Sequence, residues 1–214
     1  MEYLEKLYPG QFYHIYNRGN QKEKIFLERE NYLYFLKKYD EYISSIADTY
    51  TYCLLSNHFH FLIRIKELEE IENKQTFEVL KTLKVETAEV DTFDFSQPFS
   101  NFFNAYAKAF NKKYQRTGSL FQSRFGRKRV DSDSYLVHLV HYIHFNPERH
   151  KFTDDYRLYP FSSYQAILSL KPSHLKRETL LQWFGNREEF REFHQNYDIE
   201  RYKKIEHLIE DDDD

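Results

Sequence analysis

The short segment from Cys53 to Ile63 constrains the fold of this chain more than any other, because it is bulky, apolar and interrupted by two histidines. Its length and composition predict β-strand rather than helix. Side chains alternate between the two faces of a strand, so His58 and His60 point to one face and Phe59 to the other. Two imidazoles about 7 Å apart on one face can share a metal ion. The alternative interpretation is a pair of half-buried histidines with structural hydrogen bonds, and this segment alone does not decide between the two.

Hydrophobic patterns along the chain follow the order β-α-β-β-α-β. Strands are predicted at 12–17, 50–55, 58–65 and 125–130, and helices at 28–43, 99–114 and 134–145. This order predicts an α+β fold, a ferredoxin-like antiparallel sheet with helices on one face, in which the first and third strands are central. Enzymes and RNA binders share such folds, so the fold class does not settle the function.

The length of 214 residues fits one domain with an appendage. An acidic insertion is predicted at 67–98, because residues 67–94 hold nine Asp and Glu residues against three Lys. Residues 166–214 are expected to form a helical extension with an acidic tail. Within the main domain, Asn146 and Pro147 are expected to end the helix at 134–145.

The compartment is predicted from cysteine usage and hydropathy. Cys53 is the one cysteine of the chain, so there is no disulfide framework and a reducing compartment is expected. No apolar stretch is long enough to span a membrane, and the N-terminal residues lack a signal-type apolar region. We therefore expect a soluble cytoplasmic protein without a membrane partner.

The helix predicted at 134–145 leads into a second candidate group of functional residues. Tyr142 and Asn146 are four residues apart, so they are neighbours on the helix surface. A phenol can act as a nucleophile, and an amide oxygen can bind a metal. The chain has 19 tyrosines, most of which must serve packing, so composition does not single out Tyr142.

Residues 108–129 are rich in lysine and arginine and contain no acidic residue at all. Positive side chains contact phosphates, and aromatic rings stack on unpaired bases. The residues predicted to bind DNA are Lys112, Lys113, Arg116, Arg124, Arg127, Lys128, Arg129 and Phe121. A solvated charged face is the alternative. The absence of acids here, in a chain with a net charge of -3, favours nucleic-acid binding.

Five motifs occur in an order that resembles the single-tyrosine HUH transposases, in the branch of REP-associated tyrosine transposases and their relatives. They are YHIYNRG at 13–19, SNHFHFL at 56–62, GSLFQSRF at 118–125, YIHFNP at 142–147 and YPFSSY at 159–164. The resemblance covers residues 10–66 and 99–165. The motif that names the family, histidine, a bulky hydrophobic residue, histidine, is His58-Phe59-His60 here.

The resemblance implies that residues 1–165 form a catalytic domain that cuts and rejoins single-stranded DNA near hairpins through a 5′-phosphotyrosine intermediate. It implies that His58, His60 and Asn146 bind a divalent metal, Mg²⁺ or Mn²⁺, and that Tyr142 is the nucleophile. The implied partner is single-stranded or hairpin DNA, bound by a monomer or a homodimer. His138, one helical turn before Tyr142, is our own candidate for an assisting group.

Two other classes of function stay open. A non-catalytic protein that binds single-stranded or hairpin nucleic acid would need the fold and the basic residues, but not His58, His60, Tyr142 and Asn146 as a set. A metal-dependent oxygenase or isomerase could carry His-x-His on a β-barrel, but five glycines and long helices disfavour a barrel. We therefore expect a transposase-type endonuclease for DNA transposition or recombination.

Overall fold

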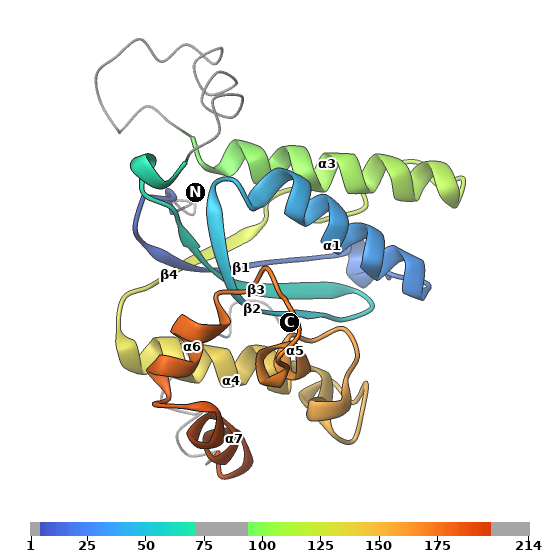
Figure 1. Ribbon diagram of the computed structural model, residues 1–214. Helices are drawn as coiled ribbons and strands as arrows, with labels where there is room; N and C mark the ends of the chain where they lie inside the picture. Colours follow the sequence, from blue (N-terminus) through green and yellow to red (C-terminus); the bar gives the residue numbers. More distant parts are fainter. Residues whose placement is uncertain (1–4, 72–93, 198–214) are drawn as a thin grey trace.

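The computed structural model describes residues 5–71 and 94–197. Its centre is a four-stranded antiparallel sheet with the strand order β2-β3-β1-β4 (Figure 1). The strands are β1 (Phe12–Arg18), β2 (Ala47–Leu54), β3 (His58–Ile65) and β4 (Gly126–Val130). The first and third strands are the central pair, which confirms the predicted order.

Helices cover both faces of this sheet. On one face lie α1 (Arg29–Ile43) and α3 (Ser96–Lys113); on the other lies α4 (Asp133–Arg149), with α5 (Tyr164–Leu168), α6 (Arg177–Trp183) and α7 (Arg187–Gln195) around it (Figure 1). The short 3₁₀ helices are η1 (Asn20–Lys22), η2 (Leu68–Glu70) and η4 (Tyr156–Leu158).

The predicted α+β class is confirmed, but the expectation of helices on one face only is corrected. All residues of β3 except one are buried, so both faces of this strand require cover.

The alternation of side chains on the central strands divides the aromatic residues between two cores. Phe59 and Phe61 of β3 face α1 and α3, where Phe35 lies at the centre of the first core. The ring centroid of Phe35 is 5.0 Å from that of Phe59 and 4.7 Å from that of Phe102 on α3. Leu62 points the other way and joins the second core, under α4. Tilted and edge-to-face ring pairs of this kind account for the high aromatic content of the chain.

Helix α4 does not end before Pro147 as predicted, but continues to Arg149. A proline in the last turn removes one backbone donor and leaves most of the helical hydrogen bonds in place. The carbonyl of Asn146 accepts from the His150 amide at 3.0 Å, and that of Pro147 accepts from the Phe152 amide at 2.8 Å. The extra turn is what brings Asn146 inside the helix, with its side chain fixed relative to Tyr142.

The segment after residue 165 packs on the same core as the sheet. Helix α5 spans the predicted boundary at 165/166, and Ile167, Leu180 and Phe190 are fully buried in the second core. In the acidic insertion predicted at 67–98, residues 72–93 lie outside the described part of the chain, and residues 96–98 form the first turn of α3. The acidic tail also lies outside the described residues.

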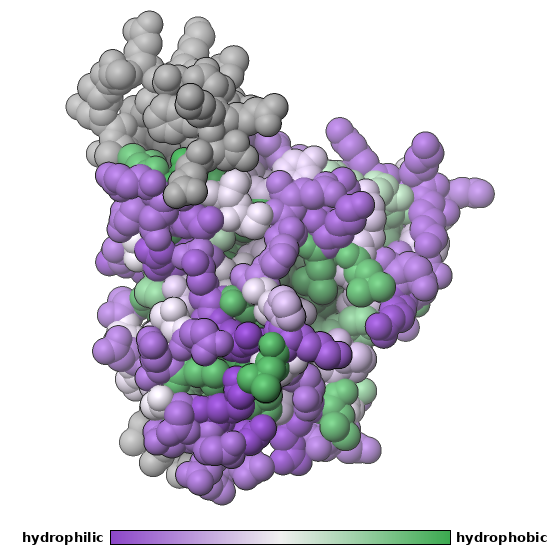
Figure 2. Space-filling model, viewed as in Figure 1, coloured by the Kyte–Doolittle hydropathy of each residue, from purple (hydrophilic) through white to green (hydrophobic). Residues whose placement is uncertain are grey.

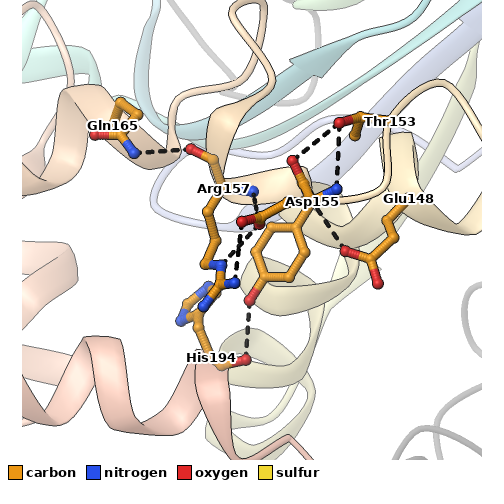
Figure 3. A network of polar contacts seen from close by, with 7 residues as sticks. Glu148, Thr153, Asp155, Arg157, Gln165 and His194 are labelled. Carbon is orange, nitrogen blue, oxygen red and sulfur yellow. Dashed lines mark hydrogen bonds and ion pairs between the residues drawn. The ribbon is translucent and has the colours of Figure 1, made fainter.

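Polar contacts around η4 tie the C-terminal segment to α4 (Figure 3). The amide of Tyr156 donates to the carboxylate of Glu148 at 3.2 Å, and its hydroxyl donates to the backbone carbonyl of His194 at 2.9 Å. Arg157 donates to both carboxylate oxygens of Asp155, at 2.7 and 3.0 Å. The two bonds of Tyr156 tie α7 to the helix that carries the candidate nucleophile, while the Arg157–Asp155 bonds stabilise η4 itself.

The outer surface in the view of Figure 2 is mostly hydrophilic, with small hydrophobic patches in the middle of the molecule. Among the described residues, no helix is both long and apolar enough to cross a membrane.

Candidate functional site

The face of the sheet under α4 gathers three histidines. His58 and His60 of β3 point to this face, and His14 of β1 lies beside His60, with 5.1 Å between the two ring centroids. All three side chains are buried. His14 belongs to one of the five sequence motifs, but nothing in the sequence marked it as a site residue, because its neighbour His60 is 46 positions away.

Helix α4 places Tyr142 and Asn146 against these histidines. The ring of Tyr142 is edge-on to His60, with centroids 5.5 Å apart, and edge-on to His14 at 6.1 Å. Asn146, one turn further on, brings its Oδ1 to 3.4 Å from His58 Nε2. The structure therefore brings His58 and His60 of β3 together with Tyr142 and Asn146 of α4, although more than 80 positions separate the two pairs in the sequence. Tyr142 is 1% exposed, so its hydroxyl lies inside the interface between α4 and the sheet.

Arg149, at the end of α4, adds a positive charge to this group. Its guanidinium carbon lies 5.7 Å from the centroid of the Tyr142 ring. A guanidinium so close to a phenol can stabilise negative charge on a phosphate that reaches the phenol. No sequence signal distinguishes Arg149 from the other arginines of the chain, and it is the extra helical turn past Pro147 that places it here.

The hydrogen bonds of His58 indicate which of its ring nitrogens can bind a ligand. Its Nδ1 lies 2.8 Å from the side-chain oxygen of Asn57, so Nδ1 carries a proton and, in the neutral ring, Nε2 carries a lone pair. That lone pair faces Asn146 Oδ1, which is also an acceptor. Two facing acceptors are satisfied by a cation between them, or by rotation of the Asn146 amide.

Unsatisfied polar atoms at the same place fit a metal ligand set. His60 Nε2 and Asn146 Nδ2 are buried and have no hydrogen-bond partner among the described residues. In the part of the chain that the structure describes, no three His, Cys, Asp or Glu side chains are grouped to hold a metal. The candidate set is therefore two imidazoles and one amide, with His58, His60 and Asn146 as the ligands. Such a set leaves open coordination positions for a phosphate.

Burial keeps His14 and His60 neutral. It lowers the pKa of His14 to about 3, and the positive charge of Lys128 adds to the effect. Burial also lowers the pKa of His60 well below its usual value, with smaller contributions from His14 and His58. A neutral imidazole is the form that binds a metal ion, so His60 does not have to lose a proton to bind one.

Part of the basic run is neutralised by acids from a distant segment. Lys113 forms an ion pair with Glu28, and Arg116 forms one with Glu23. The acids stand about 90 positions before their partners in the sequence, at the start of α1 and after η1. The sequence argument from a lack of acids within residues 108–129 therefore overlooked acids that the fold supplies. The exposed basic side chains of residues 108–129 are those of Lys108, Lys112, Lys113, Arg124 and Arg129.

Strand β4 divides the rest of the run between the two faces of the sheet. Lys128 lies opposite His14 in the register, and so it shares the face of the histidines. Arg127 lies opposite Ile15, on the face of α1 and α3, with its guanidinium carbon 4.6 Å from the centroid of the Phe125 ring. Lys128 is thus the residue of the predicted DNA-binding set that stands on the site's own face.

Phe121, predicted to stack on bases, is 6% exposed and packs in the first core. Its ring centroid is 5.4 Å from that of Phe103. The same ring lines a cavity of about 400 Å³ between α3 and residues 118–125. Asn104, Lys108 and Gln122 also line this cavity, and no carboxylate from the described residues does. Asn104 lies outside the five motifs, so nothing in the sequence distinguishes it from an ordinary surface residue, whereas Gln122 belongs to the motif at 118–125.

His138, the proposed assisting residue, is in contact with the C-terminal segment. Its Nδ1 lies 2.9 Å from the hydroxyl of Tyr197, and its ring is 5.9 Å from that of Phe193 on α7. His138 is therefore engaged by α7 and the residues after it, whereas the Tyr142 ring lies against the sheet. An assisting role for His138 stays a prediction.

A second group of histidines joins α4 to β2 and α7. His194 Nδ1 donates to the Phe190 carbonyl at 2.8 Å, so its Nε2 must accept from His144 Nδ1 at 3.0 Å. His144 Nε2 then accepts from one of the two nearby hydroxyls, those of Thr51 and Ser163, which lie 2.7 and 2.9 Å away. With both rings neutral, each of these hydrogen bonds has one donor and one acceptor.

This second group is expected to make the fold sensitive to acid. Burial lowers the pKa of His194 to about 3, a shift partly offset by its bond to Phe190, and lowers that of His144 well below its usual value. The unfolded chain takes up these protons first, near pH 6.5. The contribution of each ring to stability is therefore fully present above pH 6.5 and is lost as the pH falls towards 3, by about 1.4 kcal/mol per pH unit.

Urea unfolding between pH 6.5 and 5 tests this expectation. Replacement of His194 by leucine should lower the unfolding free energy throughout, and should also flatten its pH dependence by about 1.4 kcal/mol per unit relative to the unmodified protein. An equal slope in the two proteins would show that His194 does not stay neutral in the folded state.

Comparisons with known proteins support the fold. No family model matches the sequence, and no curated protein matches it. Among solved structures, the chain is similar to a REP-associated tyrosine transposase bound to a REP hairpin, with 17% identity and a TM-score of 0.55. The similarity covers 80% of this chain and 88% of that chain. At this level of identity the similarity shows a shared fold, the four-stranded antiparallel sheet with its helices.

Proposed function

We propose that this protein is a metal-dependent endonuclease and strand transferase of the transposase type, which cuts single-stranded DNA near hairpins through a 5′-phosphotyrosine. One observation carries the proposal: Tyr142 and Asn146 of α4 meet His58 and His60 of β3 at one buried point. The fold similarity to a transposase that binds a REP hairpin supports the choice of DNA as the partner.

The residues divide the chemistry between them. A divalent cation, Mg²⁺ or Mn²⁺, held by His58, His60 and Asn146 would withdraw charge from the scissile phosphate and orient it. The Tyr142 hydroxyl loses its proton and forms a bond to phosphorus, while the bond from phosphorus to the 3′ oxygen breaks and that oxygen takes up a proton. Arg149 is positioned to stabilise the added negative charge.

The phosphotyrosine bond keeps the free energy of the cleaved phosphodiester. A second 3′-hydroxyl can therefore attack it and join two strands without ATP. Because Tyr142 is 1% exposed, the proposal also requires that DNA binding opens the interface between α4 and the sheet far enough for a phosphate to reach the hydroxyl.

The same burial favours a second candidate, a protein that binds single-stranded or hairpin nucleic acid without cutting it. Such a protein would use Lys128 and the exposed basic residues, while Tyr142 and the histidines would serve packing only. The two candidates differ in whether a covalent bond to DNA forms.

Covalent capture decides between them. The protein is incubated with end-labelled hairpin DNA that has single-stranded flanks, with Mn²⁺ or with EDTA, and then run on a denaturing gel. We expect a labelled protein band with Mn²⁺ and none with EDTA. Tight binding of the same DNA without any covalent band, across a panel of hairpins, would favour the non-catalytic binder.

The basic residues are expected to differ in their effect on DNA affinity according to their ion pairs. Loss of one phosphate contact lowers the slope of log affinity against log salt by about 0.7 on single strands. We expect this loss for Arg124→Ala, because Arg124 is exposed, and for Lys128→Ala, because Lys128 stands on the face of the candidate site. Arg116→Ala should show less, because Glu23 already compensates its charge. Lys171→Ala, an exposed lysine in the C-terminal segment, is the matched control.

Affinities measured from 50 to 300 mM salt on a hairpin with a single-stranded flank test this ranking. If the slope of log affinity against log salt is the same for Lys128→Ala and Lys171→Ala, the face of β4 towards α4 does not contact DNA.

A further inference from the structure

We propose that His14 is a positioning residue, which accepts a hydrogen bond from His60 and thereby holds His60 in the one tautomer that can bind a metal ion. The inference rests on the metal site of the proposed function and adds a role for a residue of a different strand. It concerns the ring nitrogen of His60 that faces away from the metal.

The contact is short, buried and formed between the two central strands. His14 Nε2 lies 2.9 Å from His60 Nδ1. The two rings are 21° from parallel, and both side chains are almost completely buried. His14 comes from β1 and His60 from β3, so the pairing of these strands fixes the separation of the rings.

A hydrogen bond between two neutral imidazoles allows two arrangements of the protons. In the first, His60 Nδ1 donates to His14 Nε2, and His60 Nε2 carries a lone pair. In the second, His14 Nε2 donates to His60 Nδ1, and His60 then carries its proton on Nε2, where it blocks a metal. Only the first arrangement is compatible with His60 as a ligand.

The unsatisfied atoms of the pair show what the metal would change. His14 Nδ1 and His60 Nε2 are both buried without a hydrogen-bond partner among the described residues. The protein alone therefore leaves one ring nitrogen with a proton and one without, both unpaired, in either arrangement. A cation bound at His60 Nε2 satisfies one of these nitrogens and selects the first arrangement.

The other histidine of the motif is held in the same way. His58 Nδ1 is paired with Asn57 Oδ1 at 2.8 Å, which directs the lone pair of His58 Nε2 towards Asn146. In the proposed arrangement, the Nδ1 atom of each histidine donates to its own acceptor, which is Asn57 for His58 and His14 for His60. Metal-binding histidines usually donate this proton to a carboxylate, a carbonyl or a water. A neutral imidazole as the acceptor adds no negative charge, so the positive charge of the cation stays available for a phosphate.

The test compares His14→Gln with His14→Leu. The side-chain oxygen of glutamine reaches about as far as the Nε2 atom of histidine and can accept the proton from His60 Nδ1, whereas leucine fills similar space without an acceptor. Tyr16→Phe is the matched control, because Tyr16 lies on the same strand face and opposite His60 in the register. Binding of Mn²⁺ to the full-length protein without DNA is measured by the loss of the free-ion paramagnetic resonance signal.

We expect His14→Leu to weaken Mn²⁺ binding by about 10- to 100-fold, the usual cost of removing the partner of a metal-binding histidine. His14→Gln and Tyr16→Phe should stay within about threefold of the unmodified protein, and the melting temperature of metal-free His14→Leu should not fall in parallel with its affinity. Equal Mn²⁺ affinity for His14→Leu and the unmodified protein would overturn the proposal.

A measurement on the unmodified protein covers the case in which His14→Leu does not fold. Nitrogen-15 spectra of labelled histidine in Mg²⁺, assigned with His60→Gln, should show His60 with its proton on Nδ1. A proton on Nε2 in Mg²⁺ would overturn the role of His14. If the unmodified protein binds neither ion, the metal part of the proposed function fails together with this inference. If instead the unmodified protein forms a covalent adduct with DNA in Mn²⁺ while His14→Leu keeps full affinity for Mn²⁺, this inference alone is contradicted.

Discussion

Replacement of Tyr142 by phenylalanine is expected to abolish the covalent adduct with DNA and to reduce strand cleavage by more than about 10³-fold. The variant lacks the oxygen that we propose forms the bond to phosphorus, while the ring that packs edge-on against His60 is retained. Fold and DNA affinity should therefore change little. Cleavage of a labelled hairpin, covalent capture on a denaturing gel and a DNA titration measure the three quantities on the same preparation.

Tyr135→Phe is the matched control, because Tyr135 is the other tyrosine of α4 and is equally buried. This variant should cleave at the rate of the unmodified protein. An adduct that persists in Tyr142→Phe would show that another residue is the nucleophile. Loss of the adduct in both variants would point to damage to α4 rather than to loss of a reacting group.

Replacement of His58 or His60 by alanine should reduce cleavage by more than about 100-fold and leave DNA affinity within a few-fold. Each change removes an imidazole from the proposed ligand set, whereas the exposed basic side chains remain. Asn146→Ala should be milder, because an amide is a weaker ligand than an imidazole. Cleavage rates are compared across a range of Mn²⁺ concentrations, since a lost ligand should shift the metal dependence to higher concentration.

His174→Ala serves as the control for this series, because His174 is exposed in the C-terminal segment and is paired with Asp40. It should not alter the Mn²⁺ dependence. Unfolding of both alanine variants under conditions where His174→Ala is folded would support the structural interpretation of the two histidines. Normal cleavage by either variant would remove that residue from the ligand set.

The local features of this fold are readable from the sequence, since each depends on a periodicity within a single element. Alternation in β3 separates His58 and His60 from Phe59, and the helical period marks α1, α3 and α4. The order of these elements predicts β1 and β3 as the central strands, and the structure confirms it. The candidate residues His58, His60, Tyr142 and Asn146 came from motifs, which record residue identity and order, and the structure adds that they meet.

The ends of the helices and strands were harder to predict from the sequence. Pro147 is a helix breaker in general, so the sequence predicted that α4 ends before it. In the last turn of the helix the missing donor affects one bond only, and packing of α4 on the sheet outweighs it. Where a helix ends depends on the balance between a lost hydrogen bond and tertiary packing, and a proline in the sequence indicates only the lost hydrogen bond.

What the sequence by itself determined is the type of each element, the side of β3 on which its histidines lie, and the four residues that were expected to form the site. Only the tertiary structure decided that α4 covers the sheet face opposite α1 and α3, that Glu23 and Glu28 compensate part of the basic run, and that His14 Nε2 lies within hydrogen-bonding distance of His60 Nδ1. Periodicity and local charge report on neighbours in one element. Contacts between segments 46 or 90 positions apart are set by which surfaces pack together, and no local pattern carries that information.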